Sequence, residues 1–328
     1  MTRAERFSYL FIFLVVALAA LLHLATPLVT VLFSYFALQR LKFTRHKWLS
    51  VVLFVFLGAA VLYGFGYLVK QAIKALPTIA SESIPRIFTY ANDHGVVLPF
   101  SDLDTLKTTL LDTAKDEFRF VGNFARAATK EFVLIIIGVV VAASLFINPR
   151  VDTEAGKPKS NLFTSITEGI VARFSCFYES FEHVMGAQIM ISLINTLLTA
   201  IFVAIIQLKH GSVVIGLTFV CGLLPIVGNL ISNTIIVGIA FTISPRAAIA
   251  ALVFLIALHK LEYFLNSKII GERIKNPVWL TLLALILGER MMGIPGMILA
   301  PVILHYIKVE TSKLPPAQKP SIQTPVAS

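Results

Sequence analysis

The stretches Gly222-Leu223-Leu224-Pro225-Ile226-Val227-Gly228-Asn229 and Gly288-Glu289-Arg290-Met291-Met292-Gly293-Ile294-Pro295-Gly296 decide how this chain can fold. Each interrupts the middle of a long apolar run, at residues 213–242 and 278–307. A simple transmembrane helix needs only about 20 apolar residues, so each run is too long for one crossing and suits two half-helices. Irregular backbone survives at membrane depth only where protein or a water-filled cavity satisfies its N–H and C=O groups. Such a pair of broken segments is typical of a transporter's binding site.

Composition places the chain in the membrane independently of these breaks. Of its 328 residues, 57% are hydrophobic and 14% are charged, and the mean hydropathy is +0.83. Soluble domains have roughly 45–50% apolar and about 25% charged residues. The apolar runs are continuous rather than alternating, which excludes a transmembrane β-barrel. We therefore predict an all-α, polytopic helical membrane protein.

The excess of basic over acidic residues is explained better by membrane topology than by nucleic-acid binding. The net charge is +10, and four basic residues fall between Arg40 and Lys47. Lys and Arg accumulate in the cytoplasmic loops of membrane proteins, and no nucleic-acid recognition motif accompanies the charge. Cys176 and Cys221 are too few for a disulfide framework or a cysteine metal site. We expect no nucleic-acid partner, no metal and no cofactor.

The order of apolar and polar segments predicts four regions. Phe7–Leu24 is expected to be a retained first helix, and the next helix, from Thr26-Pro27, is either a full crossing or half of a bent hairpin. The regions are N-terminal transmembrane helices at 1–69, an external amphipathic helical region at 70–131, a transmembrane transport core at 132–308 and a disordered tail at 309–328.

Within the core, a polar loop is followed by an apolar stripe at helical spacing, which predicts a helix along the membrane surface. The loop and this interfacial helix together occupy 148–184, and a span at about 185–207 follows. Ser244-Pro245 is expected to begin a helix that ends near Leu265. The stripe consists of Phe163, Ile166, Ile170, Phe174, Phe177 and Phe181.

The chain is predicted to have about eight membrane segments. Whether the two broken segments cross the membrane or re-enter on the same side is left open. If both cross the membrane, the loop 266–277 lies outside. If both are re-entrant hairpins, that loop lies inside. It carries Lys268, Arg273 and Lys275 against Glu272, so the positive-inside rule favours re-entrant hairpins. The same rule places both termini in the cytoplasm.

Around the breaks the sequence resembles the autoinducer-2 exporter (AI-2E) transporter family over most of its length. Residues 224–228 resemble an Ile-Pro-x-x-Gly element, and Glu262 through Gly271 resembles a Glu-…-Pro-Lys-Ile-x-Gly stretch. Residues 293–301 resemble a Gly-Ile-x-Gly-Met-…-Pro element. The sequence departs from these patterns at Asn229, Tyr263 and Ser267.

The resemblance implies a multi-pass, homo-oligomeric transporter of the bacterial inner membrane. It implies export of autoinducer-2-like molecules or, in some members, exchange of sodium for protons. The departures affect the substrate more than the fold, because the family is broad. The partners expected on this reading are the lipid bilayer and either a small polar solute or Na⁺ and H⁺.

Polar and glycine residues at the breaks are the candidate pathway residues. Charges within apolar segments are costly and usually functional, and a polar helix face suits a neutral solute or sodium. The candidates are Pro225, Gly228, Asn229, Ser232, Asn233, Glu289, Arg290, Gly293 and Gly296. The expected arrangement places Asn229, Ser232 and Asn233 opposite Glu289-Arg290.

Three further polar residues are secondary candidates. Gln188 and Asn195 lie within a span, where such side chains also serve as hydrogen bonds between helices. Glu262 lies near a helix end, where an ion pair at the membrane interface is an alternative role.

No motif for ATP hydrolysis or proteolysis occurs in the sequence. The predicted function is therefore non-enzymatic, secondary transport of a small polar organic solute. A sodium/proton antiporter is the alternative, and a non-transporting membrane scaffold is a third reading.

Overall fold

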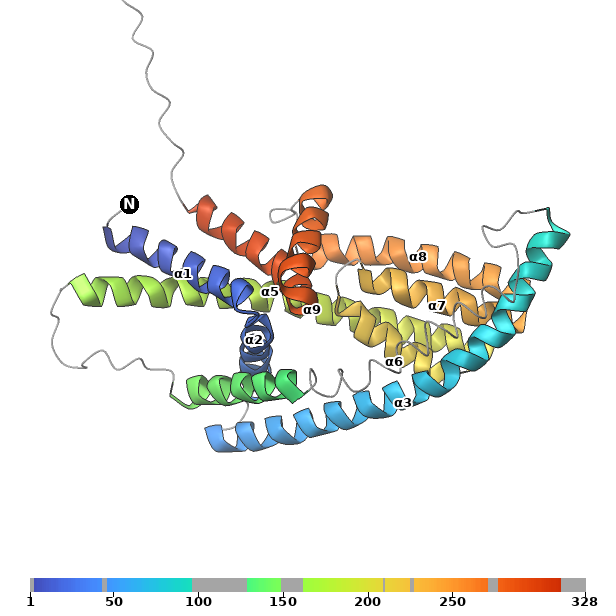
Figure 1. Cartoon of the computed structure of the whole chain (residues 1–328), viewed down its shortest axis with the longest axis horizontal. Helices are drawn as coiled ribbons and strands as arrows, with labels where there is room; N and C mark the ends of the chain where they lie inside the picture. The colour runs from blue at the N-terminus through green and yellow to red at the C-terminus, as the bar shows by residue number, and fades with distance from the viewer. Residues whose placement is uncertain are drawn as a thin grey trace, which may run out of the picture.

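The chain is helical throughout the part that the computed structural model describes, namely residues 3–42, 46–95, 129–148, 162–208, 210–224, 227–270 and 277–313. The labelled helices (Figure 1) are α1 Arg3–Leu21, α2 Ala25–Arg40, α3 Lys47–Asp93, α5 Leu162–Ile206, α6 Gly211–Gly222, α7 Val227–Ile243, α8 Pro245–Ile270 and α9 Val278–Ser312. A further helix, Thr129–Ile147, lies between α3 and α5 in the sequence.

Four of the described helices are long and apolar enough to cross a membrane, and a fifth span results if a bent pair counts as one. The four are Lys47–Gln71, Thr129–Ile147, Leu162–Ile206 and Trp279–Ser312. The bent pair consists of α1 and α2, with a bend of 119° between them, and both a broken span and a re-entrant hairpin are compatible with this bend. The polytopic helical class is confirmed, whereas the number of eight segments stays a prediction.

The helices form two packing groups that share α5. Near its N-terminal end, α5 buries Phe177 and Phe181 against α1, α2 and α9. Near its C-terminal end it buries Phe202 and Val203 against α6, α7 and α8. Figure 1 shows α5 along the long axis of the molecule, with α6, α7 and α8 beside one half of it.

This shared helix differs from the sequence prediction. We expected an interfacial helix to end near 184 and a separate span to follow, but α5 runs without a break over 45 residues. The reason is that other helices of the chain cover part of the apolar stripe. Phe177 and Phe181 are covered by α1, α2 and α9, so this segment continues into the span as one packed helix.

Helix ends follow the predicted signals in one case and not in another. The Ala247 amide donates a hydrogen bond to the Ser244 hydroxyl at 3.1 Å, which confirms the start of α8 at Pro245, although α8 continues to Ile270 rather than ending near Leu265. By contrast, α2 begins at Ala25 and its N-cap residue, Leu24, makes no side-chain cap bond.

The C-terminal helix also extends beyond its predicted end. α9 ends at Ser312, so residues 309–312 are helical rather than part of the tail. Residues 314–328 lie outside the described part of the chain. The same holds for residues 96–128, which include most of the amphipathic helix that we expected in the external region.

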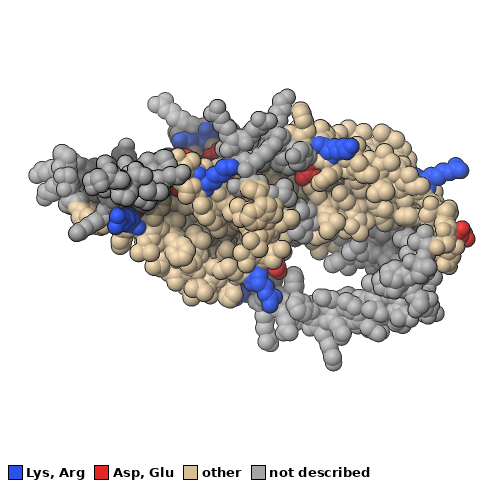
Figure 2. All heavy atoms as spheres, turned by 90° about the horizontal axis from the view of Figure 1, so that it is seen from above, with Lys and Arg blue, Asp and Glu red and all other residues tan. Residues whose placement is uncertain are grey.

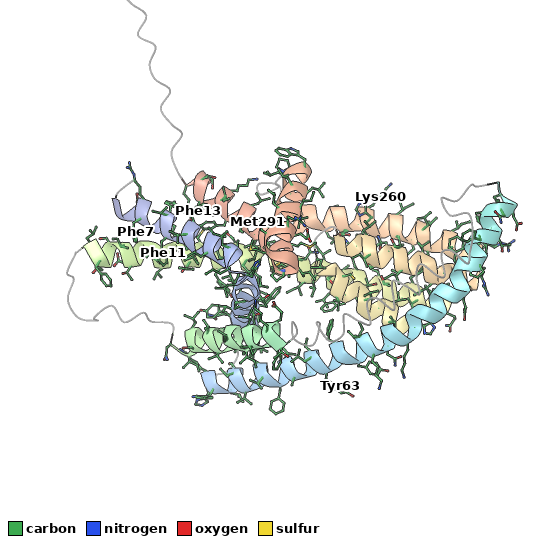
Figure 3. All side chains as sticks on the ribbon, in the orientation of Figure 1. Phe7, Phe11, Phe13, Tyr63, Lys260 and Met291 are labelled. Carbon is green, nitrogen blue, oxygen red and sulfur yellow. The ribbon has the colours of Figure 1, made fainter. Side chains whose placement is uncertain are left out.

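The described surface is mostly apolar. Phe13 is 70% exposed, Tyr63 is 80% exposed and Ile205 is 74% exposed, and Figure 3 shows Phe13 and Tyr63 on the outside of α1 and α3. Charged side chains cover little of the tan surface in Figure 2, either singly or as small groups of blue and red. A lipid bilayer is the solvent that such a surface suits.

Candidate functional site

The first break is held together by polar side chains of α5. Gln188 donates its side-chain amide to the Gly222 carbonyl oxygen at 2.6 Å. Ser192 donates its hydroxyl to the Phe219 carbonyl oxygen at 2.8 Å. These bonds satisfy C-terminal carbonyl groups of α6 that have no partner within their own helix. Gln188 therefore stabilises the backbone at the first break by this hydrogen bond.

α7 begins in close contact with the end of α6. A Cβ atom on Gly228 would overlap the carbonyl group of Cys221, so only glycine fits at this first turn of α7. Pro225, the centre of the predicted break, lies outside the described residues. The close approach brings the next residue, Asn229, beside the polar side chains of the surrounding helices.

Asn229 is bonded to Glu262, the residue that the sequence offered only as a secondary candidate. The Asn229 side-chain amide lies 2.6 Å and 2.7 Å from the two carboxylate oxygens of Glu262. Because α7 and α8 are joined by the short turn at Ser244, they pack as antiparallel neighbours. Asn229 precedes Ser244 by 15 residues and Glu262 follows it by 18, so the hairpin brings the two to similar heights.

A small polar space surrounds this pair, with contributions from four helices. α5 contributes Asn195, α6 contributes Thr218, α7 contributes Asn229, Ser232 and Asn233, and α8 contributes Leu255, Leu258, His259 and Glu262. Its volume is about 10 Å³, which is close to the minimum for a single water molecule. In this conformation the space is closed to any larger solute.

The chemistry of the space is that of oxygen ligands around one carboxylate. Asn195, Ser232 and Thr218 are buried, and the Asn195 side-chain oxygen has no hydrogen-bond donor. A buried acceptor of this kind calls for a donor or a cation. Glu262 lies beside the first turn of α7, where the helix dipole favours negative charge.

The second break is a sharp kink within α9. Gly293 has φ 64° and ψ −148°, a conformation that is essentially restricted to glycine. Pro295 stands at the start of the next arm, a position that proline favours because it has no N–H to donate. Gly288 and Gly296 then face each other across the kink without room for a Cβ atom on either.

The structure does not bring this kink opposite the polar face of α7. Glu289 and Arg290 are exposed. α9 packs against α5, α2 and α1, whereas α7 packs against α8, α6 and α3. The predicted arrangement with Asn229, Ser232 and Asn233 opposite Glu289-Arg290 is therefore wrong for this conformation, because each break lies in a different packing group.

A second buried polar cluster escaped the sequence reasoning. Glu310 accepts a hydrogen bond from the Tyr9 hydroxyl at 2.7 Å and forms ion pairs with Arg173 and Lys313. The sequence analysis placed Glu310 in the tail and so missed it. The available signal was the spacing of Glu310 from the last apolar residues of α9, which allows it to share their helix.

Several membrane-length helices, two breaks and a polar cluster within the apolar bundle define a membrane transporter rather than an enzyme. Residues 7–314 match the family model described as "AI-2E family transporter", and the chain belongs to that family, as the sequence predicted. "Putative transport protein YdbI" of Bacillus subtilis (strain 168) is 26% identical over 290 residues, a match that covers 83% of this chain and 81% of that protein.

Proposed function

We propose that the chain exports a small polar organic solute, similar to autoinducer-2, across the bacterial inner membrane by secondary, ATP-independent transport. The observation that carries this proposal is the Asn229–Glu262 pair at the start of the broken helix α7. Hydroxyl, amide and carboxylate groups converge there between α5, α6, α7 and α8. Such groups can replace the water around a hydroxylated solute.

Glu262 is the proposed coupling residue. As a carboxylate, it accepts the Asn229 amide and lies at the positive end of α7. Protonation would remove its charge and weaken both interactions, which would free Asn229 for a solute. Such a link between proton and solute would allow a proton gradient to drive transport without ATP. Glu289 fits the role less well, because its side chain is exposed.

The remaining pathway residues have supporting roles in this proposal. Ser232 and Asn233 line the same polar space as Asn229, so they are proposed to contact the solute. Gly293 and Gly296 are proposed as the hinge of α9, because no other residue fits the kink. Re-entry of both broken segments and a homo-oligomeric assembly belong to the same proposal.

Sodium/proton antiport is the second candidate. The observation in its favour is the Asn195 side-chain oxygen, which is buried without a donor in the space that the Glu262 carboxylate also lines. Carboxylate, amide and hydroxyl oxygens are the ligands that hard cations take in proteins. In this reading Na⁺ and H⁺ compete for Glu262.

The test uses vesicles that contain the purified full-length protein. Autoinducer-2 flux and sodium-dependent proton movement are measured under imposed gradients. Glu262→Gln should lower the coupled flux about tenfold or more, since a hydrogen bond to a charged group contributes about 1.5–3 kcal/mol. Glu289→Gln is the matched control, and it should stay within about twofold of the unaltered protein.

Two outcomes would contradict the proposal. Sodium-dependent proton movement without autoinducer-2 flux would establish the antiporter instead. Equal flux in the Glu262→Gln variant and the unaltered protein would move the site away from the Asn229–Glu262 pair.

A further inference from the structure

A groove of about 530 Å³ opens on the outer side of α7 and α8. One end of its lining is apolar, with Val237, Leu252 and Ile256. The other end is polar, with Asn233, His259 and Lys260. Figure 3 shows Lys260 pointing away from the helix bundle on the outer edge of α8. The groove is within the size range of small-molecule sites in proteins.

This groove adjoins the polar space around Asn229 and Glu262. Asn233, Leu255 and His259 line both, so a single layer of side chains separates the two. Leu255 is buried, whereas His259 is exposed. Movement of the Asn233 and His259 side chains would join the groove to the inner space.

We propose that the groove is a lateral entrance through which a neutral amphiphile with a hydroxylated head reaches the Asn229–Glu262 pair. This inference rests on the proposed function and changes its substrate class, because the solute would carry a short apolar body beside its hydroxylated head. The apolar lining suits a short hydrocarbon body, because Leu252 and Ile256 are 51% and 53% exposed toward the groove and its surroundings. The polar end suits a head that donates and accepts hydrogen bonds.

The charges of Lys260 and Glu262 disfavour amphiphiles with a charged head. Lys260 lines the polar end of the groove, and its positive charge disfavours a cationic head there. The Glu262 carboxylate lies behind Asn233 and His259, and it repels an anionic head that moves inward. A neutral hydroxyl group meets neither repulsion, and it can donate to the Glu262 carboxylate as Asn229 now does.

The probe is a photoactivatable octanol that carries a diazirine, applied to the full-length protein in phospholipid vesicles. Mass spectrometry should locate its adducts on the facing sides of α7 and α8. Leu252→Trp fills the groove and should lower these adducts about tenfold, which is a loss of about 1.4 kcal/mol in binding. Ile256→Trp is a second filling variant in case the first misfolds.

Val253→Trp is the matched control for the filling variants. Val253 is the next residue of α8, is 62% exposed and does not line the groove, because successive helical residues point about 100° apart. Its adducts should stay within about twofold of the unaltered protein. Excess unlabelled octanol should compete with the probe for adducts at Asn233 and His259, which line both spaces. Octanoate should compete there at least about tenfold less well, because the Glu262 carboxylate repels its head.

Adducts spread evenly over the apolar surface, or unaffected by both filling variants, would overturn the lateral entrance. Equal competition by octanoate would overturn the neutral head. Adducts that form only after an oligomer is dissociated would assign the groove to contact between copies of the chain. Labelling requires no transport, so failure of the exporter proposal in the flux assay leaves this test intact.

Discussion

At the scale of single residues, Glu310 is the most heavily bonded carboxylate among the described residues. Its side chain is only 4% exposed, and it joins three helices through Tyr9, Arg173 and Lys313. The Arg173 guanidinium also lies 4.4 Å from the centre of the Tyr9 ring. The hydrogen bond that the Lys313 ammonium donates to the Glu310 carboxylate raises the pKa of Lys313, so this bond stabilises the charged form of the lysine.

Glu310→Gln should lower the free energy of unfolding by about 3 kcal/mol, because the change leaves the partly buried Arg173 without its counter-charge. Glu182→Gln is the control. It removes an ion pair with Arg40 in which the two side chains are 37% and 64% exposed, and such pairs contribute less than about 1 kcal/mol. Denaturant unfolding in mixed micelles measures both. Equal losses would show that the Glu310 cluster adds nothing beyond a surface pair.

At the scale of the helix, the kink of α9 depends on one backbone conformation. Gly293→Ala should lower the free energy of unfolding by about 1–3 kcal/mol, because alanine is strained at φ 64° and ψ −148°. Gly64→Ala is the matched control. Gly64 lies inside α3, and a Cβ there would meet no atom within 4 Å, so helix propensity makes that change neutral or stabilising by up to about 1 kcal/mol.

This prediction is tested by comparing the free energies of unfolding of the Gly293→Ala and Gly64→Ala variants. If Gly293→Ala is as stable as Gly64→Ala, then α9 can straighten at low cost and the kink is not fixed by its sequence. The kink would then be a poor candidate for the proposed hinge.

The helix scale also shows what the sequence could predict. Glycine and proline act through local conformation, so both breaks and the start of α8 at Ser244-Pro245 were predictable. The pairing of Asn229 with Glu262 depends on the antiparallel packing of α7 and α8, and its only local signal was the similar distance of both residues from Ser244. The continuity of α5 depends on α1, α2 and α9 covering its apolar stripe, which no local pattern reports.

At the scale of the whole molecule, composition was sufficient for the class of protein and insufficient for the arrangement of its helices. Apolar residues dominate both the lipid-facing surface and the two packing groups, so hydropathy does not distinguish the residues that face lipid from those in the core. Glu310 illustrates the limit. Its partners Tyr9 and Arg173 are 301 and 137 residues away in the sequence.

The termini of two helices bear on membrane topology. The Lys47 ammonium donates to the Ile147 carbonyl oxygen at 2.7 Å, so the start of α3 and the end of the helix Thr129–Ile147 lie together. If both belong to the basic, cytoplasmic side, then α3 carries the chain outward and the helix Thr129–Ile147 returns it. The end of α3 at Asp93 then lies outside.

Single cysteines at Asp93 and Asn148 should therefore react with an impermeant thiol reagent from opposite sides of sealed vesicles. Cys176 and Cys221 are buried, and replacing both with serine removes any background reaction. Labelling of Asp93→Cys and Asn148→Cys from the same side would rule out an external region between α3 and the helix Thr129–Ile147.

The length of α5 has a mechanical consequence. Its 45 residues extend over about 68 Å at 1.5 Å per residue, roughly twice the thickness of the hydrocarbon core of a bilayer. A rod of that length acts as a lever between its two sets of neighbours. Tilting it by about 5° around its midpoint moves each end by about 3 Å in opposite directions, a displacement comparable with one hydrogen bond. A small displacement of α5 beside Glu310 would therefore displace α5 in the opposite direction beside Asn195.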